Sequence, residues 1–262
     1  MTATVPNLEL RRRIVNLVRE GRDGHIPSAF SIVDILAVLY RGVLRVDPTR
    51  PDWDERDYFV LSKGHGCVAL YAVLHERGFL SDEDLAGFCR QGGILGEHPD
   101  YTKVPGVEAS TGSLGHGFPY ATGIALGLRM DGRPNRVFSL VGDGECHEGT
   151  VWEAANLAAN LQLGNLCVFV DWNRSGAQLL PIDDLPARWA AFGWTVQEVD
   201  GHDEAAIGAA IERVEFAPRG RPHVIVAHTV KGRGGGITEG HGKWHHRIPD
   251  DDEYAQIMGA LA

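Results

Sequence analysis

The sequence is poor in cysteine, short of positive charge and free of long apolar runs. Only four of its 262 residues are cysteines, and their spacing fits neither a metal finger nor a redox motif. Lys and Arg number 25 against 35 Asp and Glu, and the net charge of −10 argues against binding to nucleic acid or to an anionic membrane surface. No apolar run approaches the length of a membrane span, and the N-terminus carries no recognisable secretory signal. We therefore expect a cytoplasmic protein with reduced thiols.

The length and composition predict one large α/β domain over residues 1–262. The hydrophobic content of 44% and the charged content of 23% are those of a soluble globular protein. From Gly117 onward, predicted helices and strands alternate, which is typical of a doubly wound parallel sheet flanked by helices. We expect helices over 8–19, 31–40, 66–77, 117–130, 149–161 and 203–215, and strands over 58–61, 136–141, 166–171, 194–199 and 224–227.

A carboxylate follows one predicted strand, and a side-chain amide follows the next. Asp143 precedes Gly144 at the end of the first strand, and Asn173 comes one strand–helix–strand unit later. Parallel strands would bring both side chains to the same carboxyl edge of the sheet. Their oxygens, with the backbone carbonyl of Ser175 in the following turn, suit Mg²⁺ or Ca²⁺ and a phosphate. Gly144 allows close approach of the backbone to that phosphate, so the pattern predicts a diphosphate-plus-metal site.

These and further segments resemble the transketolase family of thiamine diphosphate enzymes. Gly-Asp-Gly with a downstream Asn is similar to the thiamine diphosphate signature. The transketolase-like segments occur in the family's order: Gly24-His25, Ser62 to Gly66 (SKGHG), Gly96 to Pro99, Thr111 to Gly117, Ala227 to Gly234 and Lys243 to His245. The resemblance runs from about residue 10 to the C-terminus and is greatest to the separately encoded N-terminal subunit of a two-gene transketolase.

The resemblance implies a reaction, its cofactors and the residues that serve them. Thiamine diphosphate and Mg²⁺ (or Ca²⁺) would support transfer of a two-carbon ketol unit from a ketose or its phosphate to an aldose or its phosphate. His65 would contact the diphosphate side of the cofactor, whereas His25, His98 and His245 would line the substrate channel and bind or protonate the sugar. The implied cofactor-binding residues are His65, Gly112, Ser113, Leu114, Gly144, Asn173 and His245.

Some charged residues and histidines allow two interpretations. Glu148 and Glu153 complement the dipole of the helix over 149–161, but the resemblance implies a catalytic role near a subunit interface, linking two cofactor sites. Lys231 either binds an anion or is solvated. Because His245 and His246 are adjacent, we expect only His245 to point into the site. Histidines without a family match are expected to be structural or on the surface: His147, His202 and His241.

Two departures from the family pattern bear on the substrate. Pro27 stands where family members commonly have Gly, and proline fixes the backbone angle and removes an N–H donor. His116 stands where many transketolases carry Gln. The pattern therefore leaves the donor and acceptor sugars open, although not the cofactor.

The resemblance also implies a partner protein. In transketolases a pyrimidine-binding domain supplies the acid that activates the cofactor, and this chain carries only the diphosphate-binding part. We expect it to be inactive alone and to form an α₂β₂ complex with a separately encoded C-terminal transketolase subunit. The alternatives are a 2-oxo acid dehydrogenase subunit, a specialised ketol or acyloin transferase of secondary metabolism, and a non-catalytic regulatory homologue.

Overall fold

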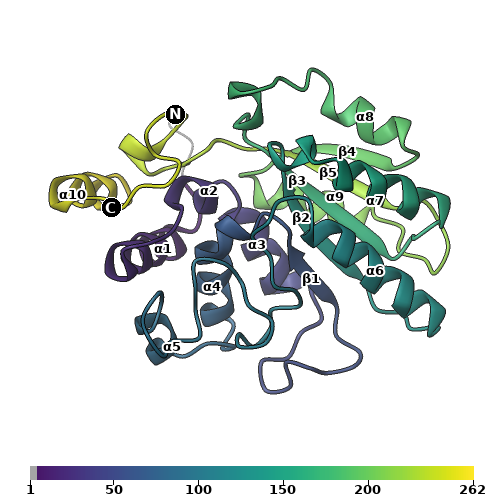
Figure 1. Cartoon of the computed structure of the whole chain (residues 1–262), viewed down its shortest axis with the longest axis horizontal. Helices are drawn as coiled ribbons and strands as arrows, with labels where there is room; N and C mark the ends of the chain where they lie inside the picture. Colours follow the sequence, from purple (N-terminus) through teal and green to yellow (C-terminus); the bar gives the residue numbers. More distant parts are fainter. Residues whose placement is uncertain (1–4) are drawn as a thin grey trace.

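A five-stranded parallel sheet forms the centre of the structure, a computed structural model that describes residues 5–262 (Figure 1). The strand order is β1-β2-β3-β5-β4, and all four pairings are parallel. The strands are β1 (Tyr58–Leu61), β2 (Val137–Gly142), β3 (Leu166–Trp172), β4 (Thr195–Asp200) and β5 (His223–His228). The predicted doubly wound sheet flanked by helices is therefore confirmed.

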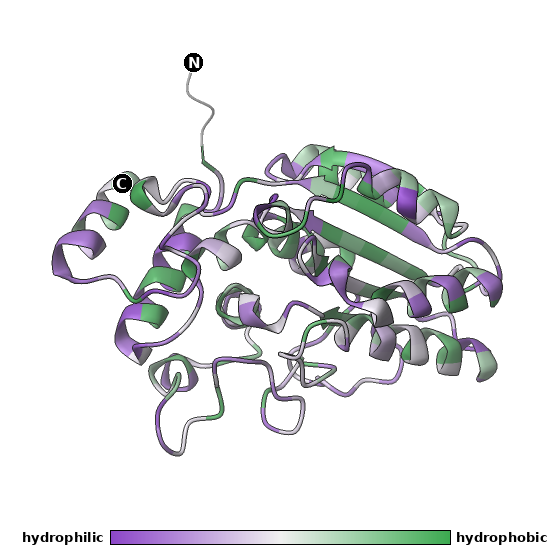
Figure 2. Cartoon of the chain, turned by 45° about the horizontal axis from the view of Figure 1, so that its top comes forward, coloured by the Kyte–Doolittle hydropathy of each residue, from purple (hydrophilic) through white to green (hydrophobic). Residues whose placement is uncertain are grey.

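Helices cover both faces of this sheet. They are α1 (Leu8–Gly21), α2 (Ile26–Phe30), α3 (Val33–Val38), α4 (Cys67–Glu76), α5 (Asp82–Ala86), α6 (Gly117–Met130), α7 (Gly149–Asn160), α8 (Leu185–Ala191), α9 (Glu204–Glu212) and α10 (Asp251–Ala260). Side chains alternate along each strand, so Phe138 and Leu140 pack with α1 to α4 and α9, whereas Val137 and Val141 pack with α6 to α8. Burial on both faces explains the continuous apolar character of β2 and β3, visible as green strands in Figure 2.

The first half of the chain departs from the predicted helix over 31–40. Helix α2 begins earlier, at Ile26, and ends at Phe30, and α3 then runs to Val38 before a π-helical turn over Leu39–Val43. Pro27 lies in the first turn of α2, where its missing N–H has no helical partner to lose. The fixed backbone angle of Pro27 is therefore accommodated in the first turn of a helix.

Two helices near the C-terminal half were not predicted. Helix α8 is capped by Asp184, which accepts a hydrogen bond from the Ala187 N–H. Helix α10 begins with a capping box formed by Asp250 and Glu253. Within residues 5–262, no helix combines the length and apolar character needed to cross a membrane.

Candidate functional site

A cavity of about 570 Å³ lies at the carboxyl ends of β2 and β3. This is the edge at which open parallel sheets bind ligands. The lining includes seven of the predicted site residues, namely His65, Leu114, Asp143, Gly144, Asn173, Ser175 and His245. It also includes polar residues to which no site role was assigned: Ser28, Lys63, Glu145, His147, Gln178 and His241.

Asp143 is a buried carboxylate held by backbone donors. Its Oδ1 accepts a hydrogen bond from the Gly144 N–H at 2.9 Å, and its Oδ2 accepts one from the Gly176 N–H at 3.1 Å. Within the described residues it forms no ion pair. Burial, followed by the negative charge of Asp171, raises the pKa of Asp143. A buried acid with a raised pKa and no cationic partner is suited to receiving a divalent cation.

Asn173 lies beside Asp143 with its amide fixed in orientation. Its Nδ2 donates to the Asp171 carboxylate at 2.9 Å and to Ser31 Oγ at 3.3 Å. Its Oδ1 accepts a hydrogen bond from the Ser175 N–H at 3.0 Å and retains a second lone pair. The Ser175 carbonyl accepts from Gln178 N–H at 3.2 Å, in the short turn that follows. The donor set of carboxylate, amide and carbonyl oxygens thus fits Mg²⁺ or Ca²⁺, while ligation by Ser175 stays a prediction.

A buried ion pair lies behind Asn173. Lys63 Nζ is 2.5 Å from Asp171 Oδ2, and it also donates to the Ser28 carbonyl at 3.2 Å. Ser31 Oγ donates to the same carboxylate at 2.7 Å, and the Thr229 hydroxyl donates to its other oxygen. The sequence gives no signal for this network, because Asp171 lies near the end of an apolar strand and no local motif marks it as a site residue.

Lys231 brings a second positive charge to the cavity. It is buried rather than solvated, and its Nζ lies 3.1 Å from His245 Nδ1. Burial, followed by the charge of Lys63, lowers the pKa of Lys231. Because Lys63 is paired with Asp171, Lys231 is the lysine of the lining that, within the described residues, is left to attract an anionic ligand.

Glu145 is a further buried acid that the sequence analysis missed. It accepts hydrogen bonds from Ser62 Oγ at 2.5 Å, from the Gly115 N–H at 2.9 Å and from the Gly142 N–H at 3.1 Å. Burial raises its pKa. Because its partners lie in three segments, Glu145 ties the loop over 111–117 to the end of β2. Of the three predicted contacts in that loop, only Leu114 lines the cavity, whereas Gly112 and Ser113 lie outside the lining.

The predicted substrate histidines are grouped at one side of the cavity. The ring of His25 lies 5.2 Å from that of His65 and 5.4 Å from that of His245, between ring centroids. His98 packs against Gly112, where an added Cβ would come within 2.9 Å of the imidazole. Burial and then the neighbouring histidines lower the pKa of His25 to about 3, and burial also lowers the pKa values of His65 and His245.

The expectations for the remaining histidines are met in part. His147 and His241 lie on the surface, but they also line the cavity. His246 was expected to point away, yet its ring stacks on His25 with centroids 4.5 Å apart, because the chain turns so that both His245 and His246 reach His25. His202 has the predicted structural role. Its ring lies 2.7 Å from Asp34 and accepts a backbone N–H. His116 is exposed, with one ring nitrogen 3.0 Å from the Leu114 carbonyl.

Glu148 and Glu153 do not line the cavity. Both are exposed, and Glu148 is the N-cap residue of α7. Glu153 borders a separate hollow of about 280 Å³ between α6 and α7, whose lining is mostly apolar. Their predicted catalytic role therefore cannot depend on direct contact with the cavity of this chain.

Comparison with known proteins identifies the family to which the chain belongs. Residues 7–261 match the family described as "Transketolase, thiamine diphosphate binding domain". The chain is 41% identical over 222 residues to the 6-deoxy-6-sulfo-D-fructose transketolase subunit of a Clostridium species, covering 83% of this chain and 80% of the relative. It is 37% identical over 253 residues to one of the apulose-4-phosphate transketolase subunits of Phocaeicola vulgatus, covering 95% of this chain and 89% of the relative.

Solved structures agree with this assignment. The transketolase from Leishmania mexicana superposes with a TM-score of 0.90 at 30% identity, covering all of this chain and 42% of that one. The fold is that of a thiamine diphosphate binding domain. The chain belongs to the transketolase family, and residues 7–261 correspond to its thiamine diphosphate binding domain.

Proposed function

We propose that this chain is the N-terminal subunit of a thiamine diphosphate- and Mg²⁺-dependent transketolase. It would transfer a two-carbon ketol unit from a ketose or ketose phosphate to an aldose or aldose phosphate. The observation that carries the proposal is the juxtaposition of Asp143 and Asn173 in one cavity with Lys63, Lys231 and His65. Carboxylate and amide oxygens beside cationic side chains suit a metal-bound diphosphate. The family match over residues 7–261 and the similarity to a transketolase subunit support the reaction class.

In this proposal Asp143, Asn173 and the Ser175 carbonyl hold the metal, and His65 contacts the diphosphate. Gly144 leaves room for the cofactor, because no Cβ occupies that part of the cavity wall. Thiamine diphosphate, when bound, supplies the nucleophilic thiazolium carbon. Leu114 and the adjoining backbone of Gly112 and Ser113 would border the cofactor from the loop that Glu145 holds in place.

His25, His98 and His245 are proposed to act on the sugar. Their imidazoles are grouped beside the cavity, and the lowered pKa values of His25 and His245 keep those two rings neutral at physiological pH. A neutral imidazole both donates and accepts hydrogen bonds, so it can bind a hydroxyl and take or return a proton.

We propose that residues 1–262 form one diphosphate-binding domain that needs a second subunit. Two relatives of similar length are named as transketolase subunits, and the chain spans only 42% of a transketolase contained in one chain. The partner would be a separately encoded, pyrimidine-binding C-terminal subunit in an α₂β₂ complex. Four cysteines without a disulfide are compatible with the proposed cytoplasmic location.

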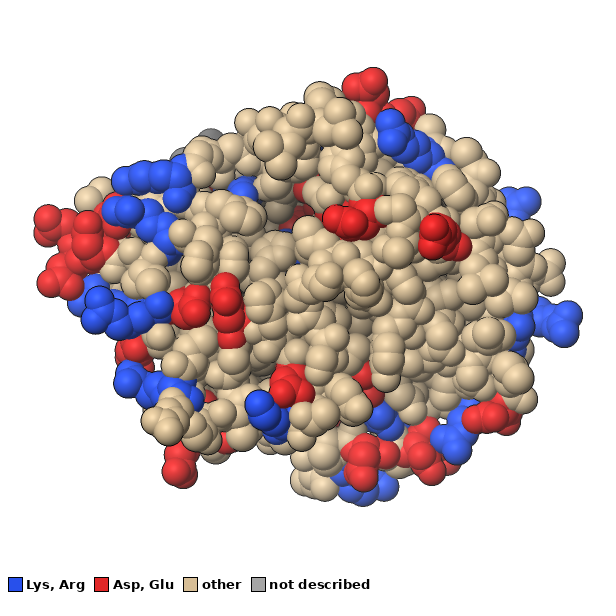
Figure 3. All heavy atoms as spheres, in the orientation of Figure 1, with Lys and Arg blue, Asp and Glu red and all other residues tan. Residues whose placement is uncertain are grey.

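The face formed by α6 and α7 supports this assembly. Figure 3 shows a broad region of it with few charged side chains. Tyr120 and Leu157 are large apolar residues that are 52% and 49% exposed there. Permanent interfaces typically bury more than ~2,000 Å² and are rich in apolar residues. Glu153 lines the hollow between these two helices, and in this proposal it and Glu148 lie near the subunit interface.

The test is reconstitution from purified subunits. The chain, a pyrimidine-binding partner subunit, and their mixture would be assayed for ketol transfer with thiamine diphosphate, Mg²⁺ and a panel of ketose phosphates and aldose acceptors. Activity is expected only in the mixture, with an α₂β₂ mass by light scattering. Full turnover by the purified chain alone would overturn the proposed dependence on a partner.

A further inference from the structure

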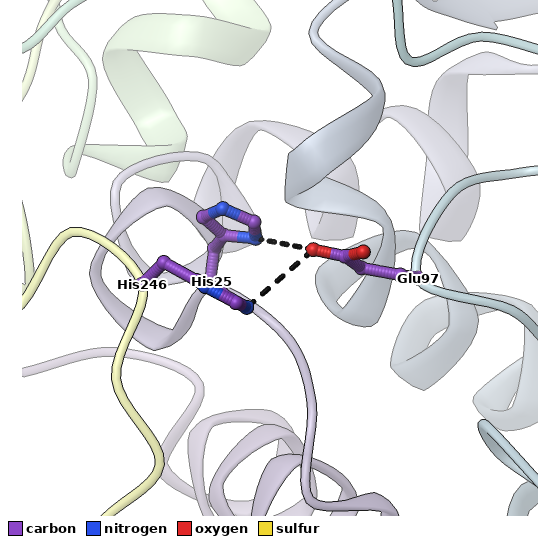
Figure 4. A group of neighbouring side chains, drawn as sticks. All are labelled: His25, Glu97 and His246. Carbon is purple, nitrogen blue, oxygen red and sulfur yellow. Dashed lines mark ion pairs between the residues drawn. The ribbon is translucent and has the colours of Figure 1, made fainter.

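Three potential metal ligands meet beside the cavity. They are His25, Glu97 and His246, which come from three distant segments of the chain (Figure 4). Glu97 Oε1 lies 3.9 Å from His25 Nδ1 and 3.5 Å from His246 Nε2. One ligand atom from each residue lies within 4.8 Å of the other two. This is the only such cluster in the part of the chain that the structure describes.

The buried member of the cluster has an unsatisfied polar atom. His25 is only 8% exposed, and its Nδ1 has no hydrogen-bond partner among the described residues. That nitrogen faces the Glu97 carboxylate at a distance too long for a hydrogen bond. Leaving a buried polar atom unpaired is costly unless a ligand satisfies it. A metal ion between the imidazole and the carboxylate would do so.

The ligand set selects the class of metal. Two imidazoles and one carboxylate match the His₂Glu set of zinc sites with an open fourth position. Tetrahedral coordination with bonds of about 2.1 Å places ligand atoms about 3.4 Å apart, so the observed separations need only small side-chain shifts. Mg²⁺ prefers oxygen ligands and belongs with Asp143 and Asn173. Asp23, whose Oδ1 lies 2.9 Å from His246 Nε2, adds a second negative charge nearby.

We propose that His25, Glu97 and His246 form a binding site for a transition-metal ion of the Zn²⁺ class. The site is separate from the proposed magnesium site, and neither Glu97 nor His246 lines the cavity. One of its ligands would be His25, which is also proposed to act on the sugar.

The test uses the tag-free chain in excess Mg²⁺. The chain competes with a chromophoric chelator for Zn²⁺, which gives its affinity, and the visible absorption of bound Co²⁺ reports the coordination geometry. One equivalent of Zn²⁺ should bind, and Glu97→Gln or His246→Gln should weaken binding at least ~10-fold and abolish the Co²⁺ bands. The matched control is His228→Gln, because His228 pairs with Glu198 at 2.8 Å without a third ligand.

Three results would overturn the proposal. The first is the absence of saturable Zn²⁺ binding, and the second is a Zn²⁺ affinity of the Glu97 and His246 variants equal to that of the wild type. The third is loss of Zn²⁺ binding in Asp143→Asn, which would place the ion at the diphosphate site. Both substituted side chains are partly or fully exposed, and circular dichroism would verify that the variants fold.

A functional consequence rests on the proposed role of His25 in ketol transfer. In the reconstituted enzyme, Zn²⁺ should inhibit by holding His25, and Glu97→Gln should remove that inhibition while leaving zinc-free activity in place. If zinc binds as expected but does not inhibit, the role of His25 is wrong and the metal site stands.

Discussion

Asn173 donates its amide N–H to the Asp171 carboxylate over 2.9 Å, and this bond determines which end of the amide faces the cavity. An amide that donates from its nitrogen to a buried acid must present its oxygen elsewhere. Lys63 neutralises the acid at 2.5 Å, so the network is electrically balanced before any ligand arrives. The proposed metal ligand is therefore oriented by residues that the metal itself does not touch.

The buried ion pair behind Asn173 should matter for stability. Lys63→Met should lower the free energy of unfolding by about 3–5 kcal/mol, because it leaves the Asp171 carboxylate buried without a counter-charge. The control is Lys103→Met: Lys103 is 60% exposed and pairs with Asp100 at 3.2 Å. That variant should cost less than ~1 kcal/mol. Urea denaturation compares the two, and equal losses would show that burial of the pair has no energetic importance.

The histidines should separate into two functional groups. In the reconstituted enzyme, alanine at His25, His98 or His245 should lower turnover by about 10²–10⁴-fold, the range for loss of a general acid or base, with little change in cofactor affinity. His65→Ala should instead weaken thiamine diphosphate binding. Steady-state kinetics and a cofactor titration distinguish these effects, and the reverse pattern would show that the roles are misassigned.

The stability of the chain should fall with acidification, in part through His25. An unfolded histidine titrates near 6.5, whereas burial and the neighbouring imidazoles lower the pKa of His25 to about 3. Between these values only the unfolded chain binds the proton, so the free energy of unfolding falls as the pH falls, by up to ~1.4 kcal/mol per pH unit. His25→Asn should flatten this slope between pH 6 and pH 5. The exposed His116→Asn should serve as control, and identical slopes in all three proteins would contradict the account.

Much of the fold was predictable because its signals are local. Strand Tyr58–Leu61 was predicted at its observed bounds, and α6 and α7 within a residue. Burial on both faces makes such strands continuously apolar, and a helix is recognised by apolar residues that recur every three or four positions. The break at Ser31 depends on tertiary contacts, since its hydroxyl bonds Asp171 far along the chain. The capping box of Asp250 and Glu253 is a local signal from which α10 could have been predicted.

The site was predictable only where residue type and motif agree. Asp143 and Asn173 lie in the same cavity, as the spacing of two strands predicted. Glu145 was missed because an acid at the start of a helix usually serves the helix dipole, whereas here Ser62 and Gly115 from two distant segments donate hydrogen bonds to it. The position of His246 was not predictable, because adjacent side chains point in opposite directions in a strand but not in this irregular segment.

The most direct test of the central claim is a calorimetric titration of thiamine diphosphate into the chain, with and without Mg²⁺. Asp143→Asn would be compared with Asp183→Asn, which removes the same charge from an exposed site. Mg²⁺ should strengthen binding to the wild type and to Asp183→Asn by at least ~10-fold, and it should have no effect on Asp143→Asn. An unchanged Mg²⁺-dependent affinity in Asp143→Asn would contradict the assignment of this sheet edge as the diphosphate-and-metal site.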